Sequence, residues 1–569
     1  MQRINQENRR IPHFSKAVWF FAYTAILVLA LETAWVTLKP DYRIINQSHS
    51  QYWANVSVSA TRGSIMDRNG SALAVSIPTA SFFIDPKSWE TKNAHYLARY
   101  FGEDAARKFS RQQPGRFYWL KRNVKMDLAA EIKGMQLPGL YTKTEYVRNY
   151  PNGAMAFHLL GYCDIDGYGQ AGVEHAWNHI LYSPPRTRFM TRSGGGNMSD
   201  PMNGMESSSK GTSGSLKLTV NTKIQEILER NLTDAAGKAQ AKWAAGICVN
   251  PRTGEVLAMA SYPAADPNDR TSFRGEEVRR NNAIGRNYEP GSVFKPIMMS
   301  IAMEAGAANK NTSHFLCKGT IPYADKIIKC NNRKAHGSED LMHVLMNSCN
   351  VGMSIMSRDV KREQAYGLLK QYGFGERSGI EMTGEEKGQI KPPEEWLGTV
   401  PANVFIGQGI SVTALQEIMA ISAIANGGAL MKPYIVKEVT DHYGKTVHKG
   451  KPRVRAQVMS SETAAFIRNA MGMVVAEGGG QKAKSDKVHI AGKTGTAQVA
   501  ERGRYQEGRY VGSFVGFWPV ENPKYAMLIS IGEPQGAYYG GVISAPVFKA
   551  IAEEIETKIP KEHVSEVSE

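Results

Sequence analysis

Three short motifs lie far apart in this chain, and the chemistry that their residues suggest requires them to meet in space. They are Ser292-Val293-Phe294-Lys295, Ser348-Cys349-Asn350 and Lys493-Thr494-Gly495-Thr496. Roughly two S-x-x-K matches are expected by chance at this length, and Ser207 to Lys210 is a second match within a Ser/Gly-rich stretch. S-x-N and K-T-G occur once each. The ordered set therefore restricts the fold to one that brings residues 292, 348 and 493 together.

Ser292 is predicted at the N-terminus of a buried helix. Glu289-Pro290-Gly291 is typical of a turn, and an apolar run over 297–303 follows. On a helix, Ser292 and Lys295 share one face. A desolvated lysine beside other cations can accept a serine proton, so Lys295 is the predicted base and Ser292 the predicted nucleophile. The alternative is a helix-capping serine followed by a solvated lysine.

Ser348 and Asn350 lie between two apolar helical stretches, 341–346 and 351–356. This pattern predicts an inter-helix turn that can face a cleft. There Ser348 would relay a proton to a leaving amine, and Asn350 would hold a substrate amide. The alternative for this motif alone is an ordinary helix cap.

Lys493 and Thr494 belong to the third motif, which is flanked by strand-like residues 488–491 and 497–500. Lys493 and Thr494 are predicted to bind a substrate carboxylate, and Gly495 would let another backbone approach the strand closely. The backbone N–H groups of Ser292 and Thr496 would form an oxyanion hole. The alternative is a solvated lysine beside a bulge glycine.

With its motifs in this order, the chain resembles the class B penicillin-binding proteins, which are peptidoglycan D,D-transpeptidases. It is most similar to the septal division type, FtsI-like and SpoVD-like. Further stretches in the order of that family are residues 62–70, residues 148–151 with His158, Gly161, Gly169, Gly172 and Glu174, residues 372–375, and residues 407–416.

The resemblance implies a serine-type D-Ala-D-Ala transpeptidase of septal wall synthesis, inhibited by β-lactams. Its substrates would be peptidoglycan stem peptides, and its partners a SEDS-type glycosyltransferase and other divisome proteins. The implied catalytic residues are Ser292, Lys295, Ser348, Asn350 and Lys493, and the implied substrate-binding residues are Thr494, Gly495 and Thr496. No metal or organic cofactor is implied.

Several other functions remain open at this point. An elongation-type transpeptidase would act on the lateral wall, and a D,D-carboxypeptidase would pass the acyl group to water. A β-lactamase is disfavoured because no E-x-x-x-N lies between Asn350 and Lys493, and a β-lactam sensor because one span is visible. A non-catalytic scaffold would have lost Ser292 or Lys295.

Residues 17–38 are nearly all apolar and long enough to cross a bilayer. Basic residues precede them (Arg3, Arg9, Arg10, Lys16), so the positive-inside rule predicts a single-pass anchor in the cytoplasmic membrane, with the rest of the chain outside. Glu32 within the span either snorkels to the headgroups or contacts a membrane partner. The net charge of +16 suits an anionic membrane surface, whereas no clustered basic stripe indicates nucleic-acid binding.

The five cysteines show no spacing typical of metal ligands. Three of them, Cys317, Cys330 and Cys349, lie around the S-x-N motif in a predicted oxidising compartment. A Cys330–Cys349 bridge, a Cys317–Cys330 bridge or three free thiols are all open. A bridge at Cys349 is expected to slow acylation of Ser292.

The predicted fold class is α+β. Hairpins around residues 250–254 and 521–524, together with the Lys493 strand, predict a five-stranded antiparallel sheet with helices on both faces. The predicted organisation is a cytoplasmic tail (1–16), a transmembrane anchor (17–38), a mixed pedestal or dimerisation-like domain (39–189), a Gly/Ser/Met-rich linker (190–215), a transpeptidase domain (216–559) and a disordered tail (560–569).

Overall fold

The computed structural model describes residues 13–38, 53–58, 61–115, 117–192, 198–199, 213–501 and 504–559. The predicted disordered tail, most of the predicted linker and Ser207 lie outside these residues. The chain divides into two compact units, one of residues 1–60 with 184–209 and one of residues 61–183 with 210–569.

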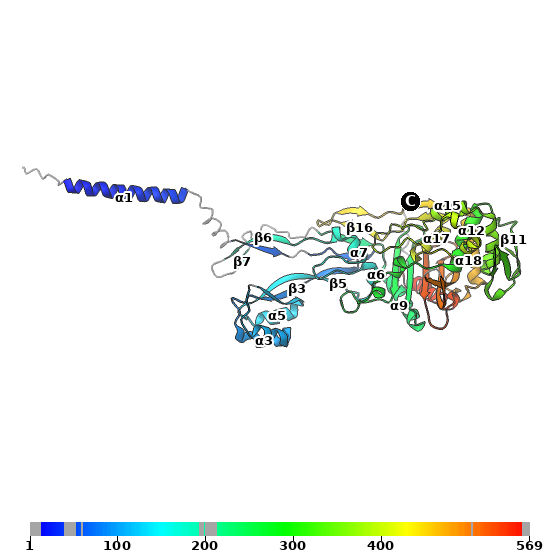
Figure 1. The fold of residues 1–569 in the computed structure, drawn as a ribbon, viewed down its shortest axis with the longest axis horizontal. Helices are drawn as coiled ribbons and strands as arrows, with labels where there is room; N and C mark the ends of the chain where they lie inside the picture. Colours follow the sequence, from blue (N-terminus) through cyan, green and yellow to red (C-terminus); the bar gives the residue numbers. More distant parts are fainter. Residues whose placement is uncertain are drawn as a thin grey trace, which may run out of the picture. The chain divides into compact units, whose positions relative to one another are not determined.

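The first unit contains a long helix and a small sheet (Figure 1). Helix α1 (His13–Leu38) is long and apolar enough over Lys16–Leu38 to cross a membrane, as predicted, and its large apolar side chains are exposed. The sheet pairs β1 (Trp53–Val58) with β6 (Arg186–Arg192), and β6 with β7 (Met198–Ser199), all antiparallel.

The second unit begins with a seven-stranded sheet whose strands come from three distant stretches of chain. Its early strands are β2 (Ile65–Met66), β3 (Ala72–Ile84), β4 (Tyr118–Val124) and β5 (Leu140–Asn149). Strand β8 (Ser215–Leu218) runs parallel to β2, and β16 (Val436–Thr440) and β17 (Thr446–Lys449) extend the sheet beyond β8. Strand β8, at the start of the predicted transpeptidase domain, therefore belongs to this sheet.

Three helices contribute to two small cores with strands β3, β4 and β5: α3 (Ala94–Phe101), α4 (Glu103–Phe109) and α5 (Met126–Gly134). Figure 1 shows α3 and α5 beside these strands. Phe82, Leu97 and Ile132 have almost no exposed area there. The burial of such side chains gives this part of the unit its own hydrophobic cores.

Two arginines and one glutamate form a buried ionic cluster where the early strands meet the following helices. Arg62 Nε and Arg148 Nε each donate to a different oxygen of Glu174 at 2.6 Å, and these side chains are at most 5% exposed. Burial alone would raise the pKa of Glu174, but the charges of Arg148 and Arg62 outweigh it and lower the pKa below its ordinary value. The two family signatures that contain these residues are therefore joined by buried ion pairs.

The predicted five-stranded antiparallel sheet is confirmed. Its order is β10-β9-β21-β20-β19, with β9 (Trp243–Val249), β10 (Val256–Tyr262), β19 (Ala491–Glu501), β20 (Arg504–Trp518) and β21 (Tyr525–Gly532). Both predicted hairpins, β9–β10 and β20–β21, are confirmed. Strand β19 carries the K-T-G motif at the edge of the sheet.

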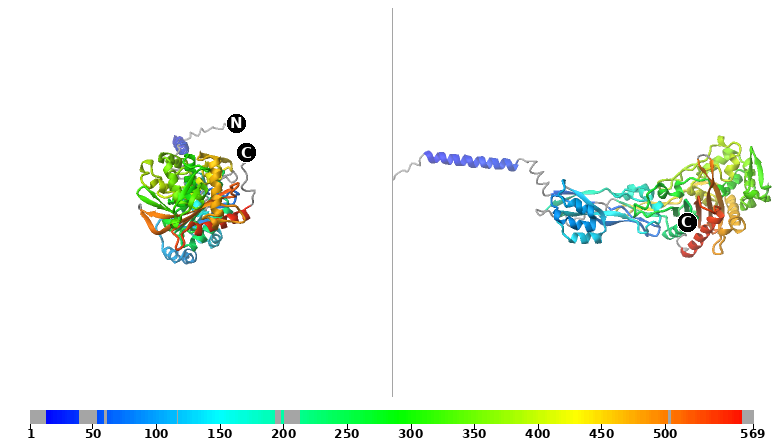
Figure 2. Two further views of the ribbon diagram at one scale, coloured as in Figure 1. Left: turned by 90° about the vertical axis from the view of Figure 1, so that its right-hand side faces the viewer. Right: turned by 60° about the horizontal axis from the view of Figure 1, so that its bottom comes forward.

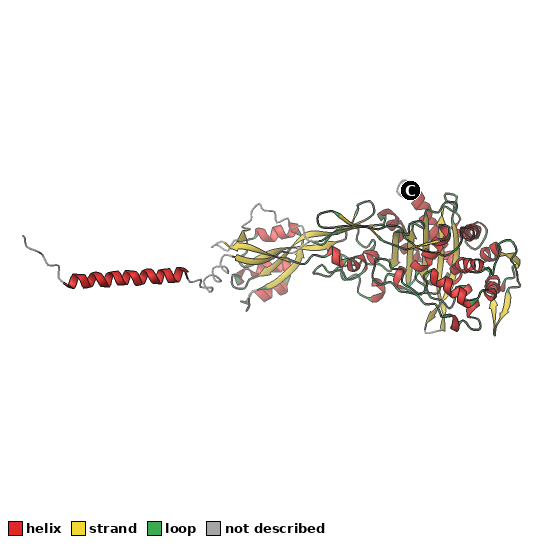
Figure 3. Cartoon of the chain, turned by 90° about the horizontal axis from the view of Figure 1, so that it is seen from above, coloured by secondary structure: helices red, strands yellow, loops and turns green. Residues whose placement is uncertain are grey.

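Helices cover both faces of this sheet. Alternate side chains of each strand point to opposite sides, and on this sheet both sets are buried, so each face forms a hydrophobic core with helices. On β9, Ala244 and Cys248 face the core made with α9 (Thr222–Lys238) and α20 (Ala545–Lys558). Ile247 faces the larger core that includes α17 (Ala414–Ala425), a helix buried along its whole length. Figure 2 shows α20 in red beside the last strands, and Figure 3 shows helices on both sides of the strands.

The remaining elements complete the second unit. They are η1 (Thr91–Asn93), α6 (Phe157–Leu160), α7 (Gly172–Ala176), α8 (Asn178–Leu181), α10 (Glu276–Arg279), α11 (Asn282–Gly285), η2 (Gly291–Phe294), α12 (Lys295–Glu304), β11 (His314–Cys317), β12 (Thr320–Tyr323), β13 (Lys326–Lys329), η3 (Asn331–Arg333), β14 (Gly337–Asp340), α13 (Leu341–Met346), α14 (Asn350–Asp359), α15 (Arg362–Gln371), η4 (Pro393–Glu395), α16 (Val400–Phe405), β15 (Ala429–Met431), β18 (Val454–Gln457), α18 (Ser461–Ala476), η5 (Gln481–Ala483) and α19 (Gly540–Ile543).

Candidate active site

Ser292 lies in the 3₁₀ turn η2, which leads directly into the buried helix α12. Pro296 occupies the first turn of α12, where its missing N–H costs least. Lys295 is the first residue of α12 and is completely buried. The predicted helix is therefore confirmed, with its first turn wound more tightly than an α-helix.

The turn that carries Ser292 is held by hydrogen bonds that involve glycines, and one of these glycines, Gly407, has no room for a side chain. Gly291 N donates to Gly407 O at 2.8 Å, and a Cβ on Gly407 would lie 2.0 Å from Gly291 O. Gly409 N donates to Glu289 Oε1 at 3.0 Å. Residues 407–409, met in the sequence only as a family mark, thus fix the backbone around Ser292.

Ser348 lies in a turn between α13 and α14, as predicted. Its backbone has φ +53°, a left-handed conformation that is uncommon outside glycine and clusters at functional sites. Cys349 caps α14 by accepting a hydrogen bond from Gly352 N at 3.3 Å. Asn350 Nδ2 donates to Lys329 O at 2.8 Å, which ties the turn to the neighbouring strand β13.

Two buried lysines converge on the Ser348 hydroxyl. Lys295 Nζ donates to Ser348 Oγ at 3.1 Å, to Ser348 O at 2.6 Å and to Asn350 Oδ1 at 2.6 Å. Lys493 Nζ donates to Ser348 Oγ at 2.9 Å and to Thr494 O at 3.0 Å. The three motifs are thus joined by hydrogen bonds through one side chain.

The same burial changes the acidity of both lysines. Desolvation lowers the pKa of Lys295 to about 8. Desolvation, followed by the positive charge of Lys295, lowers the pKa of Lys493 well below its ordinary value. Near neutral pH a fraction of Lys295 is therefore an uncharged amine, which is the form that can accept a proton.

Gly495 allows strand β19 to approach the turn that carries Ser292. A Cβ on Gly495 would lie 2.8 Å from Val293 Cγ1 and 3.2 Å from Pro290 O. The strand begins at Ala491, three residues later than the sequence pattern predicts, and runs through Lys493, Thr494 and Thr496. Close contact between strand and turn places these residues beside the serine.

One cleft of about 960 Å³ contains seven of the eight predicted site residues. Lys295, the eighth, is buried and reaches the cleft residues Ser348 and Asn350 through its hydrogen bonds. The seven that line the cleft are Ser292, Ser348, Asn350, Lys493, Thr494, Gly495 and Thr496.

The cleft also contains residues that the sequence did not identify. Tyr510, Tyr538 and Tyr539 form an aromatic wall, with stacked rings whose centroids are 4.1 and 4.5 Å apart. Lys329, Lys334 and Lys482 add positive charge at the rim. No motif marks these positions, because they enter the cleft only through the tertiary fold.

Cys317, Cys330 and Cys349 lie together beside the cleft and are free thiols, as are the other two cysteines. Neighbouring sulfurs, Cys317–Cys330 and Cys330–Cys349, are 3.7 Å apart. Neither bridge considered from the sequence is formed in this structure.

Comparisons with known proteins match both parts of the chain. The family model of the penicillin binding protein transpeptidase domain matches residues 244–553, and that of the penicillin-binding protein dimerisation domain matches residues 57–212. The chain is 32% identical to stage V sporulation protein D of Bacillus subtilis, over 93% of this chain and 83% of that protein. It is 29% identical to the peptidoglycan D,D-transpeptidase FtsI of Escherichia coli, over 96% and 93%.

Solved structures agree with these sequence matches. The crystal structure of penicillin binding protein 3 from Mycobacterium tuberculosis, complexed with aztreonam, superposes with a TM-score of 0.68 at 26% identity. The match covers 89% of this chain and 98% of that one.

Proposed function

This chain belongs to the class B penicillin-binding protein family, and on that basis we propose that it is a peptidoglycan D,D-transpeptidase acting by a serine acyl-enzyme mechanism. The observation that carries the proposal is the Ser348 hydroxyl, which receives a hydrogen bond from each of two buried lysines beside Ser292. This arrangement supplies a base, a proton carrier and a nucleophile within one cleft.

In the first step, Ser292 Oγ attacks the carbonyl carbon of the penultimate D-Ala of a stem peptide, and its proton passes to neutral Lys295 Nζ. The carbonyl oxygen becomes an oxyanion that the N–H groups of Ser292 and Thr496 stabilise. The C–N bond then breaks, and Ser348 passes a proton from the lysine pair to the departing D-Ala amine. The product is an ester of Ser292, with the terminal D-Ala released.

In the second step, the amine of a neighbouring stem peptide attacks this ester. Its proton returns through Lys295 to Ser292 Oγ as the ester C–O bond breaks, which forms the cross-link and restores the enzyme. Lys493 and Thr494 hold the terminal carboxylate of the donor, Asn350 holds a stem-peptide amide, and the lysines at the rim attract the anionic substrate.

The pH dependence of acylation tests the role of Lys295. Because the pKa of Lys295 is lowered to about 8, the fraction of neutral base rises with pH up to that value. We expect the second-order rate constant for penicillin acylation to rise roughly tenfold per pH unit below pH 8 and then to level off. Stopped-flow labelling with a fluorescent penicillin would measure it, with thermal melting at each pH as the control. A rate that is flat or falls through this range would contradict the role.

Transfer to an amine separates this function from its closest alternatives. We expect a D-Ala-D-Ala donor peptide and an amine acceptor, incubated with the full-length protein in detergent, to yield the aminolysis product. Release of D-Ala with hydrolysed peptide alone would indicate a carboxypeptidase. Rapid turnover of penicillin would indicate a β-lactamase.

We propose a septal role, which is supported by the similarity to stage V sporulation protein D and to proteins named FtsI. We expect a functional fluorescent fusion to concentrate at division septa. Distribution along the lateral wall would favour the elongation-type alternative. We propose that the domains that follow α1 lie outside the cytoplasm, which the basic residues before α1 support. A protease added to intact spheroplasts should then digest them.

Glu32 is proposed to contact a polytopic membrane partner, here a SEDS-type glycosyltransferase. It is an exposed acid in the apolar helix α1, where a carboxylate is costly unless it meets a partner or the interface. We expect Glu32→Leu to reduce both co-purification of the partner and glycan polymerisation. Thr33→Leu, at the adjacent position, is the control. Unchanged co-purification and polymerisation would favour simple snorkelling.

A further inference from the structure

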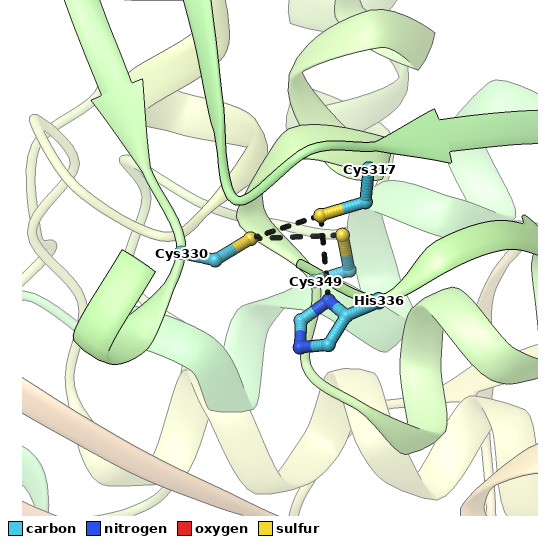
Figure 4. A group of neighbouring side chains, drawn as sticks. All are labelled: Cys317, Cys330, His336 and Cys349. Carbon is cyan, nitrogen blue, oxygen red and sulfur yellow. Dashed lines mark hydrogen bonds between the residues drawn. The ribbon is translucent and has the colours of Figure 1, made fainter. Parts of the chain in front are cut away.

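Four side chains with metal-binding atoms converge at the end of the catalytic cleft (Figure 4). Cys317 ends β11, Cys330 follows β13, His336 precedes β14 and Cys349 caps α14. Their ligand atoms all lie within 4.8 Å of one another. We refer to these four residues as the Cys3His cluster.

We propose that the Cys3His cluster is a structural zinc site. Four ligands of sulfur and imidazole type are the set that Zn²⁺ takes in closed structural sites. A soft set of three thiolates and one imidazole also disfavours magnesium, calcium and manganese.

Three of the six distances between ligand atoms fit the edges of a zinc tetrahedron. With Zn–S bonds of about 2.3 Å and a Zn–N bond of about 2.0–2.1 Å, tetrahedral angles require S···S distances of about 3.8 Å and S···N distances of about 3.5 Å. The structure has 3.7 Å for Cys317–Cys330, 3.7 Å for Cys330–Cys349 and 3.5 Å from Cys317 Sγ to His336 Nδ1. A disulfide would need two sulfurs about 2.05 Å apart.

The surroundings of the cluster suit bound thiolates. Cys317, Cys330 and Cys349 are at most 4% exposed, and the His336 side chain is 9% exposed. Gly319 N donates to Cys317 Sγ at 3.4 Å, and Gly352 N donates to Cys349 Sγ at 3.3 Å. Such outer hydrogen bonds orient metal ligands and stabilise their charge.

A buried carboxylate lies beside the cluster. Glu339 is 1% exposed, and its Oε2 receives no hydrogen bond from the described residues, although Oε1 accepts one from Asn347 Nδ2 at 2.9 Å. Oε2 lies 3.6 Å from His336 Nδ1, the nitrogen that belongs to the cluster.

The sequence predicts no metal site because its cysteines lack the short spacings that are typical of metal ligands. The ligands are separated by 13, 6 and 13 residues, with no short C-x-x-C pair to mark them. Three short segments, β11, the stretch from β13 to β14, and the start of α14, must pack together before the ligands meet. That packing is visible only in the folded chain.

A zinc ion at the cluster would link the segment around Cys330, which lines the cleft, to the turn that carries Ser348. The importance of this link for catalysis rests on the proposed function. Cys349 lies between Ser348 and Asn350, and Asn350 Nδ2 donates to the carbonyl of Lys329, next to Cys330. Zinc would therefore hold the turn in the left-handed geometry that presents Ser348 to both lysines. In this way a metal with no chemical step of its own would support acylation.

Metal content tests the site directly. Full-length protein, purified in detergent under reducing conditions without a polyhistidine tag, is expected to contain about one zinc per chain by mass spectrometry. Cys317→Ser, Cys349→Ser and His336→Ala should lose it. His336→Cys, which offers a fourth thiolate, should retain it, as should the controls Cys248→Ala and His314→Ala. Cys248 is a buried cysteine in the other core, and His314 is an exposed histidine on β11.

Cobalt substitution covers the case in which ligand variants fail to fold. The wild-type protein, stripped of metal and loaded with Co²⁺, should show the visible and thiolate charge-transfer bands of tetrahedral cobalt. A folded chain that titrates five free thiols and takes up no zinc would overturn the proposal. So would a Cys330–Cys349 bridge, mapped by mass spectrometry, in metal-free protein purified without reductant.

Acylation provides a separate readout. His336→Ala should slow penicillin labelling by about 10- to 100-fold through misplacement of Ser348, whereas His314→Ala should not. Zinc content does not depend on the reaction catalysed. Zinc without penicillin labelling in the wild type would contradict the proposed function alone, and labelling without zinc would contradict the metal site alone.

Discussion

Replacing Ser292 by alanine is expected to abolish penicillin acylation, with a loss on the order of 10⁴-fold or more. The hydroxyl oxygen forms the acyl bond, and neither buried lysine can replace it. The fold should be unaffected, because Ser292 Oγ makes no hydrogen bond to any described residue. Thermal melting and labelling with a fluorescent penicillin would measure both effects.

Ser207→Ala is the matched control, since Ser207 begins the other S-x-x-K sequence. It should label like the wild type. Lys295→Ala should lose nearly as much activity as Ser292→Ala, and the double variant little more, because the two residues act as a unit. A stable acyl adduct on a residue other than Ser292 would disprove the assignment.

Glu174→Ala is expected to destabilise the second unit by about 3–5 kcal/mol. The substitution leaves Arg62 and Arg148 buried without the carboxylate that each contacts at 2.6 Å. Denaturant titration of the full-length protein in detergent would measure the change. Although Glu174 is not in the cleft, labelling should fall as the folded fraction falls.

Glu131→Ala provides the comparison for this variant. Glu131 pairs with Arg99 at 3.2 Å in the same unit, but both side chains are about half exposed or more. An exposed pair contributes about 0–1 kcal/mol. If Glu174→Ala costs no more than Glu131→Ala, the buried cluster is not a stability element.

The residues that meet at the cleft could be identified from the sequence because their signals are local. Each motif carries its own turn, helix or strand pattern, and the two hairpins follow from short turns between apolar runs. The positions of Ser292, Ser348 and Lys493 therefore needed little knowledge of the tertiary fold.

Other features depend on contacts between distant segments and have no local signal. Arg62 meets Glu174 across more than a hundred residues, and His336 meets Cys349 only after three segments pack together. The pattern at Leu216 predicts a strand correctly, but nothing nearby indicates whether its neighbour is β9 or β2. For the same reason, the tyrosines that line the cleft could not be identified.

The seven-stranded sheet has a consequence for the order in which the chain can fold during synthesis and export. Strand β2 pairs with β8, and β8 pairs with β16, which lies more than two hundred residues further along. Until residue 440 has emerged, one edge of β8 has no partner and remains a template for aggregation. The early strands therefore remain only partly assembled until β16 has emerged. A chaperone that shields exposed strands during this interval would help most before β16 arrives.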